Sequence, residues 1–204
     1  MTKSEARDII VKCVQLYKNN LCDKELIFVY FLNAQIHYVR VVYRVKNYKH
    51  LTGVVSDYTP KKFFEVCYNK KISQNEISFK ENGTTLLKLE ILERMMNIIE
   101  QVKFIGDYLN TNVYLGLDKV VGNVFAGLGI EKGSELYFPK SILRGDMRKQ
   151  IYNMAVVSAV LEKPLQELNA KYKIVKIHDN LTKKQEQSIQ SFVCGINSAC
   201  GFDS

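Results

Sequence analysis

The chain has 204 residues, of which 47% are hydrophobic and 25% are charged. This composition is that of a globular protein, and it excludes a disordered segment or a fibrous repeat. Lys and Arg number 29 against 21 Asp and Glu, which gives a formal net charge of +8. The excess favours a polyanionic partner such as nucleic acid, although solvated surface lysines would give the same total.

The sequence carries no sign of export, membrane insertion or metal binding. No apolar run reaches 18 residues, and the N-terminal MTKSEARDII lacks the apolar core of a secretory signal. The five Cys are scattered, so we expect reduced thiols in a cytoplasmic protein that has no membrane partner. The three His are not at metal-ligand spacing, so neither a metal nor a cofactor is expected.

The first part of the chain predicts a helix followed by a β-hairpin. Over residues 4–21 apolar side chains recur at helical spacing, at Ile10, Cys13, Val14, Tyr17 and Leu21. Residues 26–32 form a continuous apolar run of strand length, and residues 36–45 predict the next strand. The short connection at residues 33–35 indicates a hairpin.

The middle of the chain predicts a loop and two helices. Residues 47–53 are expected to form a loop, and Pro60 suits the first turn of a short helix over residues 61–69. A longer helix is expected from about residue 84 to about residue 104. Its apolar face would carry Leu87, Ile91, Met95, Ile98 and Val102.

The second half of the chain predicts a run of strands and a terminal helix. The segments of strand length are residues 113–117, 121–130, 136–138, 152–161 and 172–177. A helix over residues 181–193, opened by Thr182, would form a C-terminal helical tail from about residue 181. This order of elements predicts an α+β protein with a mostly antiparallel sheet, and the lack of a clear linker predicts a single domain over residues 1–204.

The positive charge is concentrated in three segments. The net charge is +4 over residues 46–80, +3 over residues 132–149 and +4 over residues 163–184, against −3 over residues 81–131. If the sheet brings these segments together, they form the basic face that a binder of the phosphate backbone needs. If the segments point in different directions, no such face exists.

The glycine-rich stretch at residues 122–133 does not predict a nucleotide site. It matches neither G-x-G-x-x-G nor a Walker loop, and it does not open a helix. Its glycines favour bulges or close strand approach in a curved sheet instead.

His50 is the strongest candidate for acid–base chemistry. It follows a strand, with Lys46 and Lys49 before it and Thr52 and Gly53 after it. An imidazole titrates near neutrality, and neighbouring ammonium groups can stabilise the charge that grows on a phosphodiester under attack. The other two histidines are weaker candidates: His37 is expected to be structural, and His178 is an accessory base or an ordinary surface residue.

The segment NYKHLTG at residues 47–53 is accompanied by further motifs along the chain. They are Phe63-Phe64 with Cys67, Lys71-Ile72, Asn82-Gly83-Thr84-Thr85 followed by Lys88-Leu89, AGLG at residues 126–129, and YFPKSIL at residues 137–143. Over roughly residues 5–178 this pattern resembles a phage and mobile-element nuclease family of the barnase–EndoU–colicin–RelE superfamily. The HLTG block is the most specific part of the resemblance.

The resemblance implies a metal-independent, ribonuclease-like domain of barnase or RelE type, with N-terminal helices and a curved antiparallel sheet. Its chemistry would be attack of an RNA 2′-OH on the adjacent phosphate, which leaves a cyclic phosphate and a 5′-OH. His50 would be the general base or acid, Lys88 would hold phosphate near a helix N-terminus, and Ser141 would bind phosphate or position the nucleophile. The remaining RNA or phosphate contacts are expected from Lys49, Thr52, Lys61, Lys140 and Arg144, and Thr52 would also orient His50.

Under the same resemblance the partners would be RNA and an antitoxin or immunity protein, in a toxin-like role. The oligomeric state is left open. A non-catalytic RNA- or protein-binding module on the same scaffold is the main alternative, because no second catalytic His is evident. A nucleotide-using transferase is disfavoured by the missing phosphate loop. Lys88 as a solvated helix residue and Ser141 as a turn cap are the structural alternatives at those positions.

Overall fold

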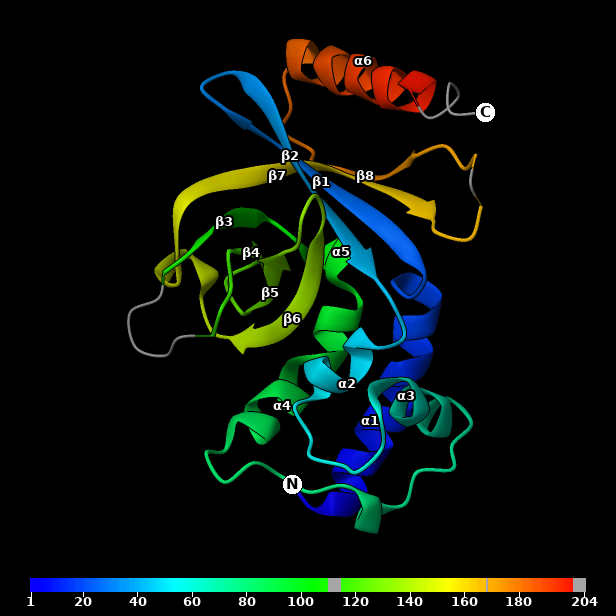
Figure 1. The fold of residues 1–204 in the computed structure, drawn as a ribbon. Helices are drawn as coiled ribbons and strands as arrows, with labels where there is room; N and C mark the ends of the chain where they lie inside the picture. The colour runs from blue at the N-terminus through cyan, green and yellow to red at the C-terminus, as the bar shows by residue number, and fades with distance from the viewer. Residues whose placement is uncertain (110–114, 168, 200–204) are drawn as a thin grey trace.

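The computed structural model describes residues 1–109, 115–167 and 169–199, and it places a helical layer against a β-barrel (Figure 1). Helix α1 (Lys3–Asn20) begins at a capping box, in which the side chains of Thr2 and Glu5 each accept a backbone N–H from the other residue. Its buried face includes the predicted residues Ile10, Cys13, Val14 and Tyr17. The expected amphipathic helix is therefore confirmed.

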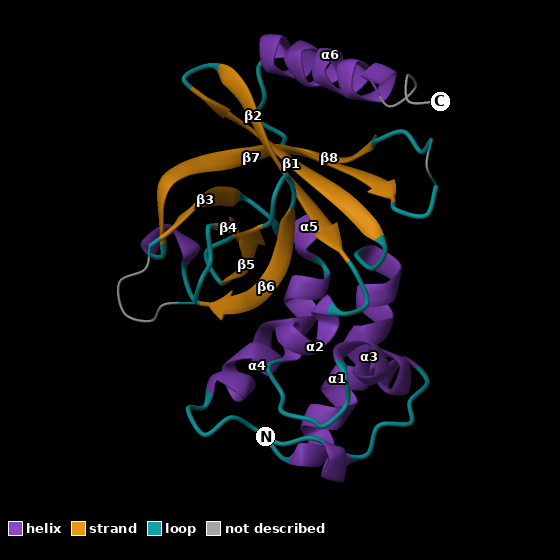
Figure 2. Ribbon diagram, viewed as in Figure 1, coloured by secondary structure: helices purple, strands orange, loops and turns teal. Residues whose placement is uncertain are grey.

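Seven strands close into the barrel (Figure 2). They are β1 (Lys24–Leu32), β2 (Gln35–Tyr43), β3 (Phe104–Tyr108), β4 (Lys119–Gly122), β5 (Ala126–Lys132), β6 (Tyr137–Arg144) and β7 (Ile151–Pro164). Their order is β1-β2-β6-β5-β4-β3-β7, and β7 pairs back with β1. Strand β8 (Lys173–Ile177) extends the sheet from β7. Strands β2 and β6 run parallel, and the other neighbouring strands in the described chain run antiparallel.

The predicted α+β class is confirmed, whereas the barnase- or RelE-like form of a curved antiparallel sheet is not. The sheet closes because β7 is 14 residues long. Its first half, residues 151–156, pairs with β3, and its second half, residues 157–164, pairs with β1. A strand of this length can pair with strands at both ends of the sheet order and thereby join them.

Several predicted element boundaries are wrong, and the strand expected over residues 136–138 extends to Arg144 as β6. The single strand expected over residues 121–130 is two strands, because the Asn123 Oδ1 accepts the backbone N–H groups of Phe125 and Ala126 and forms a turn. The long helix expected to reach residue 104 is broken at Asn97 into α4 (Thr84–Met96) and α5 (Ile98–Gln101), after which β3 begins. The strand expected at residues 113–117 lies partly outside the described residues, and residues 115–117 are not in a strand.

The loop expected at residues 47–53 is instead helix α2 (Asn47–Thr52). Asn47 supports its first turn, because its Oδ1 accepts the backbone N–H of Arg44 at 2.9 Å. Gly53 ends the helix in the left-handed conformation, with φ at +72°. Tyr48 and Leu51, three residues apart, are buried on one face. His50 therefore lies on a short helix and not in an extended loop.

The short helix near Pro60 and the terminal helix are present as expected, although the terminal helix ends at Ala199 and not at residue 193. Helix α3 (Pro60–Tyr68) has Pro60 in its first turn, and the Thr59 side chain accepts the Lys62 N–H. Helix α6 (Lys183–Ala199) follows Thr182, whose hydroxyl oxygen accepts the Gln185 N–H. Two short 3₁₀ helices, η1 (Gln74–Glu76) and η2 (Met147–Lys149), complete the described elements.

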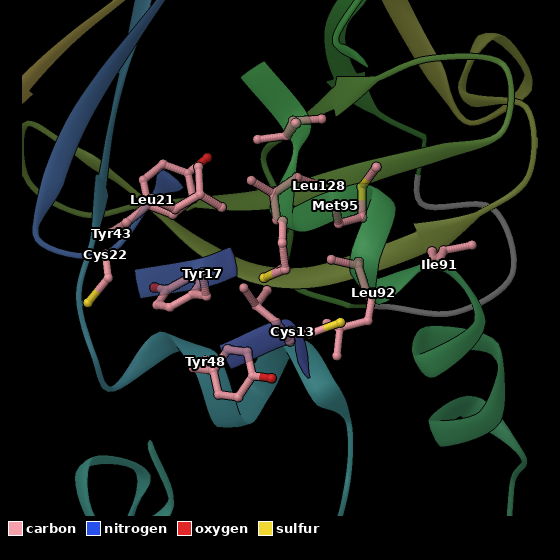
Figure 3. Packing of buried hydrophobic residues seen from close by; sticks show 14 of the residues in the cluster. Cys13, Tyr17, Leu21, Cys22, Tyr43, Tyr48, Ile91, Leu92, Met95 and Leu128 are labelled. Carbon is pink, nitrogen blue, oxygen red and sulfur yellow. The ribbon is translucent and has the colours of Figure 1, made fainter. Parts of the chain in front are cut away.

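The main core lies between the helical layer and the inner face of the barrel (Figure 3). It contains Tyr17 of α1, Tyr48 of α2, Leu92 and Met95 of α4, and Leu128 of β5. This packing fixes α2 and α4 relative to β6, which both helices contact. The buried free thiols Cys13, Cys22 and Cys67 also belong to this core.

Helix α6 covers a separate cluster on another face of the sheet (Figure 1). Its residues Ile189, Phe192 and Ile196 pack with Ile27 and Val29 of β1. Neither α6 nor any other helix of the described chain has the length and apolar character needed to span a bilayer.

Two buried tyrosines of the core predict opposite effects of losing a hydroxyl group. The Tyr48 hydroxyl donates to the Ile10 carbonyl at 2.6 Å, whereas the buried Tyr43 hydroxyl has no partner among the described residues. We expect Tyr48→Phe to lower the free energy of unfolding by about 1 kcal/mol, and Tyr43→Phe to leave it unchanged or raise it. Urea denaturation of both variants measures the difference. A larger loss in Tyr43→Phe than in Tyr48→Phe would contradict this reading of the core.

Candidate functional site

Helices α2 and α4 meet where the Lys88 side chain crosses the end of α2. The Lys88 Nζ donates to the backbone carbonyl of His50 at 3.2 Å. Lys88 is half-buried in this position, and His50 is exposed. Two of the three predicted catalytic residues, from positions 38 residues apart, are therefore neighbours.

Gly53 makes this crossing possible. A Cβ atom at position 53 would come within 2.7 Å of the Lys88 Cδ. The positive φ of Gly53 also disfavours any other residue there. The glycine of the HLTG block thus ends α2 and makes room for the stem of Lys88.

Thr85 fixes the start of α4 beside this crossing. Its buried hydroxyl donates to the Gly53 carbonyl at 2.8 Å and accepts the backbone N–H of Lys80 at 3.0 Å. The cap residue of α4 is Gly83, which offers no side chain, and the Asn82 Oδ1 accepts the first N–H of the helix, that of Thr84, at 3.2 Å. The dipole of a helix favours anions at its N-terminus, and Lys88 extends from the second turn of the same helix.

Burial and neighbouring cations perturb the titration of both groups. Although His50 as a whole is exposed, partial desolvation of its imidazole lowers its pKa below the ordinary value of 6.5, with further lowering from Lys88, Lys49 and Lys80. Burial, assisted by Lys80, lowers the pKa of Lys88 to about 8. The imidazole is therefore mostly neutral at pH 7, and the lysine is still mostly charged. This arrangement places a proton acceptor beside a cation.

Ser141 does not share this contact. It is buried in β6, and its cross-strand partner is Gly129 of β5. The side chain of Leu117 packs over Gly129, while the neighbouring residue Ile142 joins the main core. Because neighbouring strand residues point to opposite faces, Ser141 lies on the Leu117 side of the sheet. No hydrogen bond joins it to His50 or Lys88 within the described chain.

Lys49 and Thr52 have structural partners. The Lys49 Nζ donates to the backbone carbonyls of Ser56 and Tyr58, at 2.7 and 2.5 Å. The Thr52 hydroxyl donates to the Lys49 carbonyl at 2.7 Å, and Thr52 is fully buried. These bonds hold the turn that follows α2. They show Thr52 supporting the helix that carries His50, and they do not show it touching the imidazole.

The other basic candidates are spread over different elements. Lys140 on β6 pairs with Glu131 at 2.8 Å, and Arg144 at the end of β6 pairs with Glu90 of α4 at 3.0 Å. Lys61 is exposed in the first turn of α3. Among Lys49, Lys61, Lys140 and Arg144, Lys49 is the residue whose charge lowers the pKa of His50.

Sequence reasoning did not single out Lys80, Gly53 or Thr85 as parts of this site. Lys80 lies at the end of the basic segment 46–80 and lowers the pKa of both His50 and Lys88. Gly53 and Thr85 were visible in the sequence as the last residues of the HLTG and GTT motifs. In the structure these two residues are joined by the hydrogen bond from the Thr85 hydroxyl to the Gly53 carbonyl. Throughout the described residues, no three His, Cys, Asp or Glu side chains gather as they would around a metal ion.

The sequence that forms this site matches one known protein family. A family model described as phage-Barnase-EndoU-ColicinE5/D-RelE like nuclease4 matches residues 9–193. The match includes α2, α4 and the whole barrel. No curated protein and no solved structure matches the chain. Since the family model covers most of the sequence, the chain belongs to this family of phage barnase–EndoU–colicin–RelE-like nucleases.

Proposed function

We propose that this protein is a metal-independent endoribonuclease of a phage or mobile element, with its reaction centre at the crossing of α2 and α4. The observation that carries the proposal is the contact between Lys88 and the His50 carbonyl, beside the N-terminus of α4. A neutral imidazole, a lysine with a pKa of about 8 and a nearby helix N-terminus are groups that can assist phosphodiester transfer.

In the proposed reaction the neutral His50 imidazole takes the proton of an RNA 2′-OH. The 2′ oxygen then forms a bond to the adjacent phosphorus, and the bond from phosphorus to the 5′ oxygen breaks. Lys88 stabilises the added negative charge and supplies a proton to the leaving 5′ oxygen, which its pKa of about 8 permits near neutrality. The products are a 2′,3′-cyclic phosphate and a 5′-OH. Ser141 has no part in this proposal, because it faces the Leu117 side of β6.

The charge around the site supports RNA as the substrate. Lys80 is exposed next to the crossing, and Lys61 is exposed on α3, which packs against α2. Both belong to the basic segment 46–80, and ammonium groups at the surface attract a phosphate backbone without reading its sequence. In this proposal the basic segment guides the RNA and His50 with Lys88 cleaves it.

Incubation of the purified protein with total RNA and excess EDTA tests the proposal. We expect cleavage that survives EDTA and that falls by roughly 100-fold or more in His50→Ala, as loss of a general base does. His178→Ala is the matched control, because His178 lies beyond the end of β8 and has no role in the proposed reaction.

Two results would contradict this function. Cleavage that EDTA abolishes would indicate a metal-dependent reaction. No cleavage, combined with RNA binding that weakens as salt rises, would favour the non-catalytic binding module.

The pH dependence of kcat/KM provides a second prediction. The midpoint of the acid limb should lie below pH 6.5, because His50 must be neutral to act as a base and its pKa is lowered from that value. The alkaline limb should lie near pH 8, because Lys88 must stay protonated and its pKa is about 8. We therefore expect a bell-shaped profile when initial rates are measured on a defined oligonucleotide.

The Lys88→Arg variant tests whether Lys88 is the group that causes the alkaline limb. An arginine stays charged at every pH in this range, so a partly active variant should lose the alkaline limb and keep the acid limb. An alkaline limb that stays near pH 8 in this variant would mean that another group titrates there.

A further inference from the structure

A second polar cluster lies in a cavity of about 310 Å³ at the barrel end remote from α1 and α5. It is lined by the far ends of β1 and β3 and by the starts of β4 and β7. Its polar side chains are Asp107, Lys119 and Asn153, and its walls include Tyr30, Leu32, Ile105 and Met154. The mouth of a closed barrel is a frequent place for a small-molecule site, and apolar walls with a few converging polar groups are typical of one.

The three polar side chains form one connected unit. Asp107 and Lys119 are direct cross-strand partners and form an ion pair. The Asn153 amide donates to the second oxygen of the same carboxylate at 2.9 Å. The side chains of Asp107 and Lys119 are 25% and 21% exposed, so both are partly withdrawn from water. The ion pair is electrically neutral, and it therefore gives no preference for an anion such as phosphate.

The backbone is distorted at this cluster. The pairing of β3 with β7 shifts register between Ile105 and Asp107, and Asn153 has a φ of +49°. A Cβ atom at Gly106 would lie 2.7 Å from the Tyr152 carbonyl, so the two strands approach closely here. Bulges of this kind re-aim a side chain, and the left-handed conformation suits glycine better than any other residue. Asparagine at position 153 adds the carboxamide that reaches Asp107.

The cluster retains unused hydrogen-bonding capacity. A carboxylate offers about four acceptor positions and an ammonium group three donors, and the contacts between the three side chains use only part of them. Acceptors of Asp107 and Asn153 thus lie beside donors of Lys119, at a partly apolar cavity with an aromatic wall. A flat, neutral heterocycle with a donor next to an acceptor fits this arrangement. In a member of a nuclease family, the ligand with that chemistry is a nucleobase.

We propose that the cavity lined by Asp107, Lys119 and Asn153 binds a nucleobase, either in a free nucleoside or as one base of an RNA strand. The volume lies at the lower end of the range for small-molecule sites, roughly 300–1,000 Å³, which limits the occupant to about one nucleoside. The site is separate from the crossing of α2 and α4, and the proposal does not require that the protein cleaves RNA.

Titration of the full chain with guanosine, adenosine, cytidine and uridine, followed by calorimetry and by amide NMR shifts, tests this site. We expect at least one nucleoside to bind with a Kd below about 1 mM and to shift the amides of residues 105–107, 119 and 153. Asn153→Gly should weaken that binding by about 10-fold or more. It should not destabilise the fold, because glycine suits the left-handed conformation.

Lys70→Gly is the matched control, since Lys70 also has a positive φ, +58°, and lies outside the cavity. It should bind the nucleoside like the unmodified protein, and so should His50→Ala. Competition by a single-stranded oligonucleotide would identify RNA bases as occupants, and binding without such competition would identify free nucleosides; either result supports the proposal.

Three results would overturn it. The first is that none of the four nucleosides binds with a Kd below about 1 mM. The second is that Asn153→Gly binds the nucleoside as tightly as the unmodified protein. The third is that inorganic phosphate shifts the same amides to the same extent. Loss of RNA cleavage in His50→Ala with nucleoside binding intact would leave this proposal standing, so the two functions are tested separately.

Discussion

The absence of a side chain at residue 53 is the constraint on which the α2–α4 site depends. Gly53 ends α2 in a left-handed conformation and leaves space for the stem of Lys88, which a Cβ atom at this position would meet at 2.7 Å. If α4 stood farther away, Lys88 would extend into water and its pKa would remain near that of a free amine. The close approach buries the lysine and brings its charge to His50. The short α2 contributes as well, because the carbonyl of His50, near the helix C-terminus, favours a cation.

The parts of the fold that follow a local pattern could be predicted from the sequence. The face of α1 and the first hairpin follow from apolar spacing and a short turn, and α3 follows from Pro60. Closure of the barrel could not be predicted, because it depends on pairing between β1 and β7, whose paired residues range from Tyr30 with Val157 to Lys24 with Pro164 and lie far apart in the chain. Helix α2 was missed for a related reason: six residues are too few to show helical periodicity, and its stability comes from burial of Tyr48 and Leu51.

In the candidate site, too, individual residues could be predicted from the sequence, whereas their contacts in space could not. His50 could be selected from its basic neighbours, and the family resemblance added Lys88, but neither could show that the two residues touch. Resemblance also added Ser141, and the register of β5 with β6 turns that residue to the side of Leu117. The number of Lys and Arg residues was a poor guide to the positive charge that can bind phosphate, since Lys140 and Arg144 form ion pairs with Glu131 and Glu90. Ion pairing is a property of the folded chain, and a count of residues does not contain it.

Closure of the barrel also has a consequence for how copies of this protein meet one another. A sheet edge with unpaired N–H and C=O groups is a template for another chain, and the pairing of β7 with both β1 and β3 removes such edges on those strands. Two edges remain in the described sheet: the part of β2 before its pair with β6 at Val41, and the outer edge of β8, which carries Lys173 and Lys176. The Lys176 ammonium group donates to the carbonyls of Glu100 and Val102 next to that strand. A charged, five-residue strand discourages edge-to-edge pairing. The same β7 pairing that shapes the barrel therefore also limits the strand edges at which two copies of the protein could pair.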